Sequence, residues 1–228
     1  MKKLKKMNEI AWACGLLFCA FGVALCTKAD LGLSMIAAPP YIIHIFMENF
    51  LPWYSQGTSE YIWQAVLLII MCIIVRRFKP KYLLTFVCAV LFGLAVDGFL
   101  WLLGGPKAYE TTAARIVAFI LGEGITTVAI AFNFRTSMPL QVYELVVTEI
   151  SKRYCLNINK VKQANDIIML AVSLILAFAL NRSFDGIGVG TIIITIVNAP
   201  LIAAFGKLLD KFCDFSPRFP KFVEWAKL

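Results

Sequence analysis

The sequence predicts an all-α polytopic membrane protein with six transmembrane helices, arranged as a 3+3 inverted repeat. Three observations lead to this fold class. Of the 228 residues, 60% are hydrophobic, whereas a soluble domain is roughly 45–50% apolar. Apolar runs long enough to cross a hydrocarbon core of about 30 Å occur six times. Finally, each half of the chain has the same order of elements, namely a span, a short helix and two further spans.

The six spans are expected where hydropathy is high and charge is sparse. They lie near Ile10–Thr27, Tyr61–Val75, Tyr82–Leu103, Ala113–Phe134, Val161–Asn181 and Gly186–Phe205. The first run follows basic residues, but it is long and has no A-x-A-like cleavage site, so we expect a retained helix and not a signal peptide.

The basic residues predict the topology. Of the 22 lysines and arginines, all but Lys28, Lys107, Arg115 and Arg182 fall at the two ends of the chain, in the turn after the second span or in the segment after the fourth. Because cytoplasmic loops are enriched in Lys and Arg, both termini are expected in the cytoplasm. The net charge of +8 then reflects topology and anionic lipid headgroups, and no nucleic-acid partner is expected.

The two halves are expected to be one repeat each within a single membrane domain of residues 1–228. Residues 8–105 form the first, with a short helix over 34–48, and residues 113–212 the second, with a short helix over 137–152. Three matches support the alignment, and they pair Ser34-Met35 with Ser137-Met138, Asp97 with Asn198, and Gln64 with the neighbourhood of Gln163 and Asn165. Since three spans is an odd number, the second half must be inverted. Inverted repeats in secondary transporters place the substrate site near the midplane, beside interrupted helices.

The short helices raise two alternatives. Ser34 and Ser137 could cap them, and the first could instead begin at Pro39, since proline is tolerated at a helix start. Lys28 and Arg135 stand nearby, and two basic, amide-rich points would suit a small anion or a carboxylated solute. The helices could be re-entrant, which requires protein or water around them, or they could lie flat at the interface.

Polar residues inside the spans are candidate substrate-binding or coupling residues, because ionisable groups there usually face the bundle interior or a cavity. Asp97 and Glu123 come first, followed by Asp166, Asn198 and Gln64. Burial disfavours the charged form of a carboxyl group, so Asp97 or Glu123 could carry a proton during transport. Hydrogen bonding between helices, without a role in transport, is the alternative.

Further expectations concern the neighbours of these residues. Asp97 should lie beside Asn198, Gln64, Glu123 or the N-terminus of a half-helix. Pro200 should break or kink the last span. Glu144, with Gln141 and Thr148, reads as a solvated face of the second short helix.

Enzymatic chemistry is not expected. The sequence has no Ser-His-Asp or HExxH arrangement, its single histidine is His44, and the spacings of its seven cysteines match no metal site. We therefore expect no cofactor and no metal.

The run "FGVALCTKADLGLSMIAAPPYII" resembles the YczE/YyaS/YitT group of bacterial integral membrane proteins. The matching positions are a glycine, Gly22, and the motif Ala29-Asp30-Leu31-Gly32-Leu33-Ser34 after the first span. Members often continue with Pro-Trp, whereas this chain has Met35-Ile36. The resemblance implies a small protein of the bacterial inner membrane and carries over Gly32 and Ser34 as motif positions only.

The leading hypothesis is a small secondary transporter or exporter of a small polar or anionic solute, with its site between the repeats. One alternative is a motor-less substrate-binding subunit of an importer, and another is a non-transporting assembly or regulatory factor. The expected partners are the solute, the lipid bilayer, and either further copies of the chain or a partner membrane subunit.

Overall fold

The protein is an all-α bundle in the computed structural model, which describes residues 7–105, 109–182, 184 and 186–226. Six lysines that entered the topology prediction lie outside these residues, namely Lys2, Lys3, Lys5, Lys6, Lys107 and Lys227. The helices are α1 (Asn8–Ala29), α2 (Ala38–Glu48), α3 (Gln56–Val75), α4 (Tyr82–Leu102), α5 (Thr112–Asn133), α6 (Val142–Tyr154), α7 (Ile158–Leu176), the π-helical turn η1 (Ala177–Asn181), α8 (Val189–Phe212) and α9 (Pro220–Ala226).

Six of these helices are long and apolar enough to cross a membrane: α1, α3, α4, α5, α7 with its continuation to Leu180, and α8. They match the six predicted spans. Large apolar side chains point outward along them, including Ile73, Trp101 and Ile196, which are 65–81% exposed. Such a surface suits lipid and would be unfavourable in water. The chain is therefore a multi-pass membrane protein.

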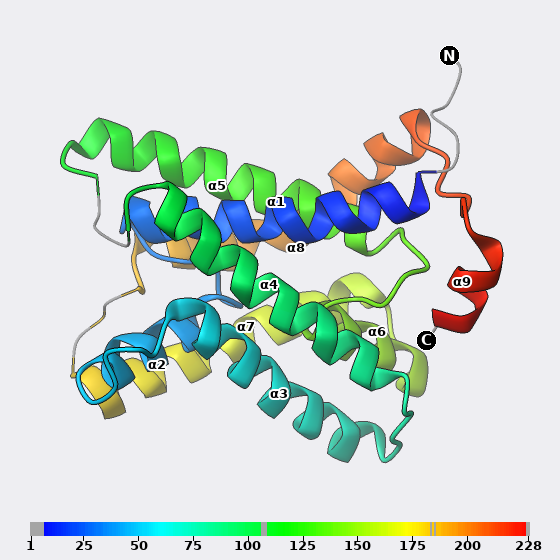
Figure 1. The fold of residues 1–228 in the computed structure, drawn as a ribbon, viewed down its shortest axis with the longest axis horizontal. Helices are drawn as coiled ribbons and strands as arrows, with labels where there is room; N and C mark the ends of the chain where they lie inside the picture. The colour runs from blue at the N-terminus through cyan, green and yellow to red at the C-terminus, as the bar shows by residue number, and fades with distance from the viewer. Residues whose placement is uncertain (1–6, 106–108, 183, 185, 227–228) are drawn as a thin grey trace.

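α1 and α5 run antiparallel and side by side, along the upper side of the bundle in Figure 1. Their backbones approach closely at Gly22 and Gly122, where a methyl group on Gly122 would lie 2.8 Å from the carbonyl oxygen of Gly22. Small residues permit this kind of close helix packing in membranes. At one end of the pair, Arg115 Nε donates to the carbonyl oxygen of Ala29 over 2.8 Å.

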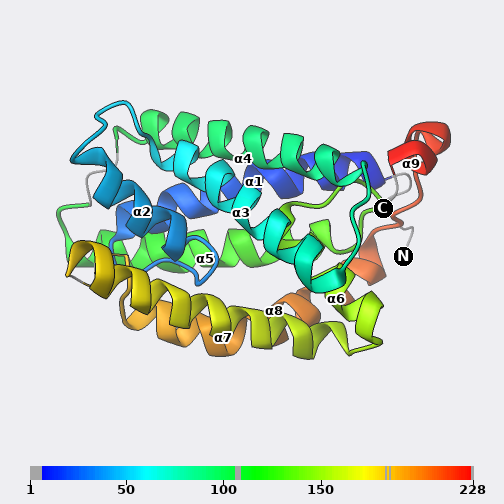
Figure 2. The ribbon, with the colours of Figure 1, turned by 90° about the horizontal axis from the view of Figure 1, so that it is seen from below.

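The remaining long and short helices repeat one pattern of contacts around the α1–α5 pair. α4 packs on α1 as α8 packs on α5, and α3 packs on α4 as α7 packs on α8. α2 contacts α3 and α7, and α6 contacts α7 and α3. The two short helices lie toward opposite ends of the bundle (Figure 2).

The short helices are enclosed by the long ones to different degrees. In α6 every residue from Val142 to Val147 is buried, whereas in α2 burial is concentrated in the first half. In neither helix does the N-cap residue's own side chain cap the first turn, and these N-cap residues are Ala37 and Gln141, so the prediction that Ser34 and Ser137 cap the helices is wrong. α2 begins at Ala38 with its prolines in the first turn, where they leave few N–H groups to cap.

Two long helices differ from their predicted bounds. α3 begins at Gln56, earlier than expected, because the hydroxyl of Ser55 accepts from the backbone N–H of Thr58 and caps it. α8 continues as one element through Pro200 to Phe212, so this proline does not end the helix.

Candidate functional site

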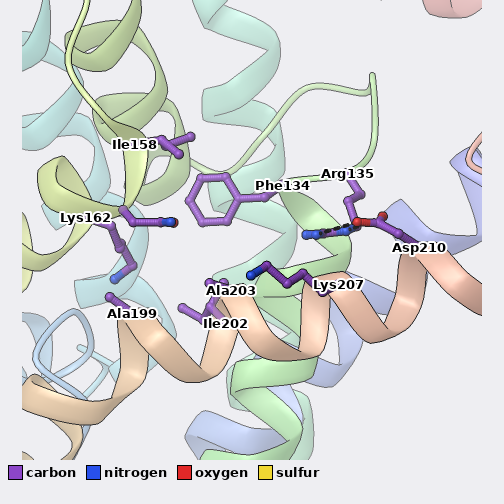
Figure 3. A pocket seen from close by; sticks show the side chains of 10 residues that line it. Phe134, Arg135, Ile158, Lys162, Ala199, Ile202, Ala203, Lys207 and Asp210 are labelled. Carbon is purple, nitrogen blue, oxygen red and sulfur yellow. Dashed lines mark hydrogen bonds and ion pairs between the residues drawn. The ribbon is translucent and has the colours of Figure 1, made fainter.

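A basic pocket opens between the end of α5, the start of α7 and the second half of α8 (Figure 3). Its cavity measures about 350 Å³. The lining residues are Phe134, Arg135, Ile158, Asn159, Lys162, Ala199, Ile202, Ala203, Lys207 and Asp210. Three cationic side chains, from the turn after α5, from α7 and from α8, thus face one cavity whose lining includes a single carboxylate, and this favours an anionic ligand.

Arg135 is held in place on one wall of the pocket. Its Nε donates to Asp210 Oδ1 over 2.7 Å, and its Nη2 donates to Oδ2 over 2.9 Å. This bidentate geometry fixes the plane of the guanidinium group. Lys207, from the turn of α8 preceding Asp210, lies on the same side of the cavity (Figure 3).

Lys162 forms the inner end of the pocket and is the least exposed of its cations. Its side chain is 7% exposed, and its ammonium group forms an ion pair with Asp166, one turn further along α7, whose side chain is fully buried. The pair is stabilising only while both partners are charged, because a lone buried charge is costly. Lys162 also interacts electrostatically with Glu123 and Glu144, so it connects the pocket with the interior.

Three buried glutamates converge behind Lys162, at the centre of the bundle. They are Glu60 from α3, Glu123 from α5 and Glu144 from α6, each at most 4% exposed. All three interact electrostatically with the thiol of Cys19 in α1. The cluster therefore lies where both halves of the chain meet.

Each glutamate has an unused hydrogen-bonding oxygen. Tyr143 donates to Glu60 Oε2 over 2.9 Å, and Cys26 donates to Glu123 Oε1 over 3.7 Å. The other oxygen of each, and Oε2 of Glu144, have no partner among the described residues. Buried polar atoms of this kind usually need a ligand, a proton or water.

The pKa of Glu144 shows the effect of burial in this cluster. Burial raises the pKa of Glu144 to about 7, because the charged carboxylate is disfavoured away from water. A carboxyl group with that pKa exchanges protons near neutral pH. The prediction of a solvated face is wrong, since α3, α4 and α7 cover the helix that carries Glu144.

Asp97 has a different place from the one predicted. It is half-buried, and it accepts from Ser55 Oγ over 2.6 Å and from the backbone N–H of Gly57 over 2.7 Å. It therefore holds the N-terminus of α3 and contacts neither Asn198, Gln64 nor Glu123. Its electrostatic interaction with Glu60 still connects it to the central cluster.

The other predicted residues are dispersed. Asn198 is buried and accepts from Thr127 Oγ1 over 3.4 Å. Gln64 Oε1 accepts from the backbone N–H of Val142 over 3.3 Å, so α3 supplies the cap of α6 that Ser137 was expected to supply.

Lys28 and the two serines lie outside the pocket. Lys28 Nζ donates to the carbonyl oxygen of Gly105 over 3.1 Å, near the far end of the bundle. Ser34 is buried, and its carbonyl oxygen accepts from the backbone N–H groups of Ala37 and Ala38. The backbone N–H of Ser137 donates to Asn8 Oδ1 over 2.8 Å. The structure thus brings Arg135 to the pocket and Glu123 and Asp166 to the electrostatic network behind it.

Sequence reasoning missed Glu60, Glu144, Lys162 and Lys207 as site residues. Glu60 stands just before the apolar run that defined the second span, and Lys162 stands at the very start of the run that defined the fifth, so both were read as belonging to the ends of the spans. The sequence did contain one indication of their role. Glu60 and Lys162 are each followed four residues later by another polar residue, Gln64 or Asp166, on the same face of the helix. In the structure, each is the fifth residue of the second long helix in its half.

A family model described as a family of unknown function, DUF6198, matches residues 6–207. The chain belongs to this family. DUF6198 thus covers all six long helices except the end of α8. The chain is also 23% identical over 209 residues to the uncharacterized protein YyaS of Bacillus subtilis (strain 168), which covers 90% of this chain and 95% of that protein. This bears out the resemblance to YyaS-like proteins. No solved structure matches the chain.

Proposed function

We propose that the protein is a small secondary transporter or exporter of a small anion, coupled to proton binding in its interior. One observation carries the proposal, namely the position of Lys162. It lines the basic pocket, is paired with buried Asp166 and interacts with Glu144 and Glu123. A ligand that binds Lys162 therefore changes the electrostatics of the buried carboxyl groups.

The direction of coupling follows from charge balance. An anion in the pocket attracts the ammonium group of Lys162 and weakens its pairing with Asp166. A buried carboxylate without its cation is costly, so Asp166 or the neighbouring Glu144 gains from binding a proton. Anion binding and proton binding then favour each other, and linkage requires this coupling to be reciprocal.

The arrangement of the halves supports a transporter. Contacts around α1 and α5 are repeated in the two halves, and α2 and α6 lie toward opposite ends. These features support the proposal of an inverted repeat, in which one half would rock against the other around a central site. The central site here would be the glutamate cluster, which takes residues from both halves.

We also propose that the protein resides in the bacterial cytoplasmic membrane with both termini in the cytoplasm. Figure 1 places α9, the start of α1 and the turn between α3 and α4 at the same end of the bundle. The lysines and arginines of the described part concentrate at this end, as expected of a cytoplasmic side. The basic pocket would then open to the cytoplasm.

A ligand screen followed by a flux assay tests the function. Purified protein is screened by thermal shift against anions, carboxylates, amines and vitamins, because a ligand of the folded state raises stability by RT ln(1 + [L]/Kd). An anion that stabilises the protein is then assayed for flux in proteoliposomes with and without a pH gradient. We expect saturable flux that responds to the gradient.

Lys207→Gln and Lys211→Gln form a matched pair for this assay. Both remove one exposed cation from α8, but only Lys207 lines the pocket. Lys207→Gln should weaken anion binding about fivefold, the value of one lost interaction of about 1 kcal/mol, and Lys211→Gln should not. Tight binding without flux would favour a motor-less binding subunit instead. Absence of any ligand response would favour an assembly or regulatory factor.

A further inference from the structure

A second basic hollow lies on the same end of the bundle, away from the pocket described above. It is formed by the turn between α3 and α4 and by the end of α6, and its cavity measures about 350 Å³. We refer to it as the basic cup. Its lining residues are Val75, Arg76, Arg77, Lys79, Glu149, Lys152 and Arg153.

One carboxylate organises the basic cup. Glu149 Oε2 accepts from Lys79 Nζ over 2.9 Å and from Tyr82 Oη over 2.6 Å. Burial acts to raise the pKa of Glu149, but the hydrogen bonds from Tyr82 and Lys79 outweigh it and hold the pKa below its usual range. Glu149 thus remains charged, and it can neutralise only one of the five cations around the hollow.

An apolar groove lies between α3 and α4, next to the basic cup. It has a volume of about 460 Å³ and is lined by Ala65, Leu68, Ile69, Cys72, Ile73, Phe78, Leu83 and Phe86. Ile69, Ile73 and Phe78 are 59–69% exposed. The groove is therefore open along the outer face of two helices that cross the membrane, where acyl chains are the surrounding solvent.

The cup and the groove adjoin at Tyr82. Its hydroxyl contacts Glu149 of the cup, and its ring packs against Phe78 of the groove with centroids 6.2 Å apart. Along the turn itself, Arg77 and Lys79 line the cup while Phe78 between them lines the groove. Charged and apolar surfaces thus meet within a few residues.

We propose that the basic cup and the adjoining groove bind one anionic phospholipid, with its phosphate in the cup and an acyl chain in the groove. Charge complementarity selects the headgroup, because four cations remain beyond the one that Glu149 neutralises. The groove selects an amphipathic ligand over a free phosphate ion, which has no apolar part to bury. Basic pockets at the cytoplasmic ends of membrane helices are suited to such headgroups.

The test compares two lipids with identical acyl chains in mixed micelles. Phosphatidylglycerol should raise the melting temperature of the full chain more than phosphatidylcholine does, and native mass spectrometry should retain bound phosphatidylglycerol. Arg77→Gln/Arg153→Gln should weaken phosphatidylglycerol binding by roughly thirtyfold, since each cation near a lipid surface contributes roughly 1 kcal/mol. Lys211→Gln/Lys221→Gln removes the same charge from exposed sites outside the cup and should retain binding.

A groove variant separates the lipid from its headgroup. Ile73→Trp fills the groove at a side chain that is 69% exposed, where a change of size is tolerated. It should reduce binding of long-chain phosphatidylglycerol and leave the response to inorganic phosphate unchanged.

Three results would overturn the proposal: equal stabilisation by the two lipids, equal losses in the two double variants, or a full response to inorganic phosphate alone. None of these readouts depends on transport, so the two proposals can fail separately.

Discussion

The two helix junctions that flank the central cluster differ in how tightly they close. At the junction of α3 with α4, Gly57 and Gly93 bring the backbones together, and a methyl group on Gly57 would lie 2.1 Å from the carbonyl oxygen of Gly93. Asp97 adds hydrogen bonds to Ser55 and Gly57 across this junction. At the junction of α7 with α8, the basic pocket of about 350 Å³ opens beside Asn159 and Lys162.

The fifth residue of the second long helix illustrates the difference. In α3 it is Glu60, which is fully buried and accepts from Tyr143 of α6. In α7 it is Lys162, which lines the open pocket. The same position in the two halves thus carries opposite charges, one buried at the closed junction and one at the inner end of the open pocket. The difference teaches that the central cluster is approached by an open pocket on the α7–α8 side, whereas direct backbone contact closes the α3–α4 side.

The largest effect is expected from removing the cation at the open end. Lys162→Met leaves Asp166 buried without its ion-pair partner, which should cost about 3–5 kcal/mol of unfolding free energy at neutral pH. Lys162→Met/Asp166→Leu removes both charges and should regain most of that stability, while anion binding stays lost. Denaturant unfolding in detergent measures both. A single variant as stable as the original protein would show that the pair does not support the open junction.

The next effect concerns the centre, where Glu144 interacts with Lys162, Asp166 and Cys19. Its pKa of about 7 lies above the ordinary 4.5, so the folded protein binds more protons between these values than the unfolded chain does. Stability from this group is therefore present at low pH and is lost as pH rises toward 7, by about 3 kcal/mol in total.

Glu144→Gln removes this titration. Compared with the original protein, the variant should gain relative stability between pH 5 and pH 8, as measured by unfolding at both values. If the two proteins show parallel pH dependence, Glu144 does not carry an exchangeable proton.

The smallest effect tests the closed junction. Gly93→Ala places a methyl group 2.4 Å from the carbonyl oxygen of Gly57, and overpacking of this kind costs about 1–3 kcal/mol. Gly98→Ala, on the same helix with open space around it, should be neutral or stabilise by up to about 1 kcal/mol. Thermal unfolding compares the two. If the two variants had the same melting temperature, the close packing of α3 on α4 would not depend on Gly93.

The six spans could be predicted because hydropathy depends on composition over a whole helix. The start of α3 could not, because Gln56, Ser59 and Glu60 are polar yet buried against protein. Polar residues at the end of an apolar run are usually exposed to water, whereas these three contact other helices.

The candidate site was predictable only in part. Glu123 and Asp166 were found because each interrupts an apolar run, and the basic position of Arg135 was recognised. The partners of Asp97 were not predicted, because the alignment of the two halves paired Asp97 with Asn198. Asn198 instead contacts Thr127 of α5 and Met35. Which helices cover Glu144 depends on tertiary packing, and the amphipathic pattern of one helix does not contain that information.

The central claim is proton-coupled anion transport, in which one half rocks against the other. Such rocking would open one junction while it closes the other, and distances between spin labels measure this directly. Labels at positions 156 and 211 report on the junction of α7 with α8, and labels at 53 and 101 report on that of α3 with α4, all at exposed positions. With a stabilising anion in proteoliposomes, a change from pH 8 to pH 5 should shorten the first distance and lengthen the second. Unchanged distributions at both pairs, in vesicles that transport the anion, would contradict the account.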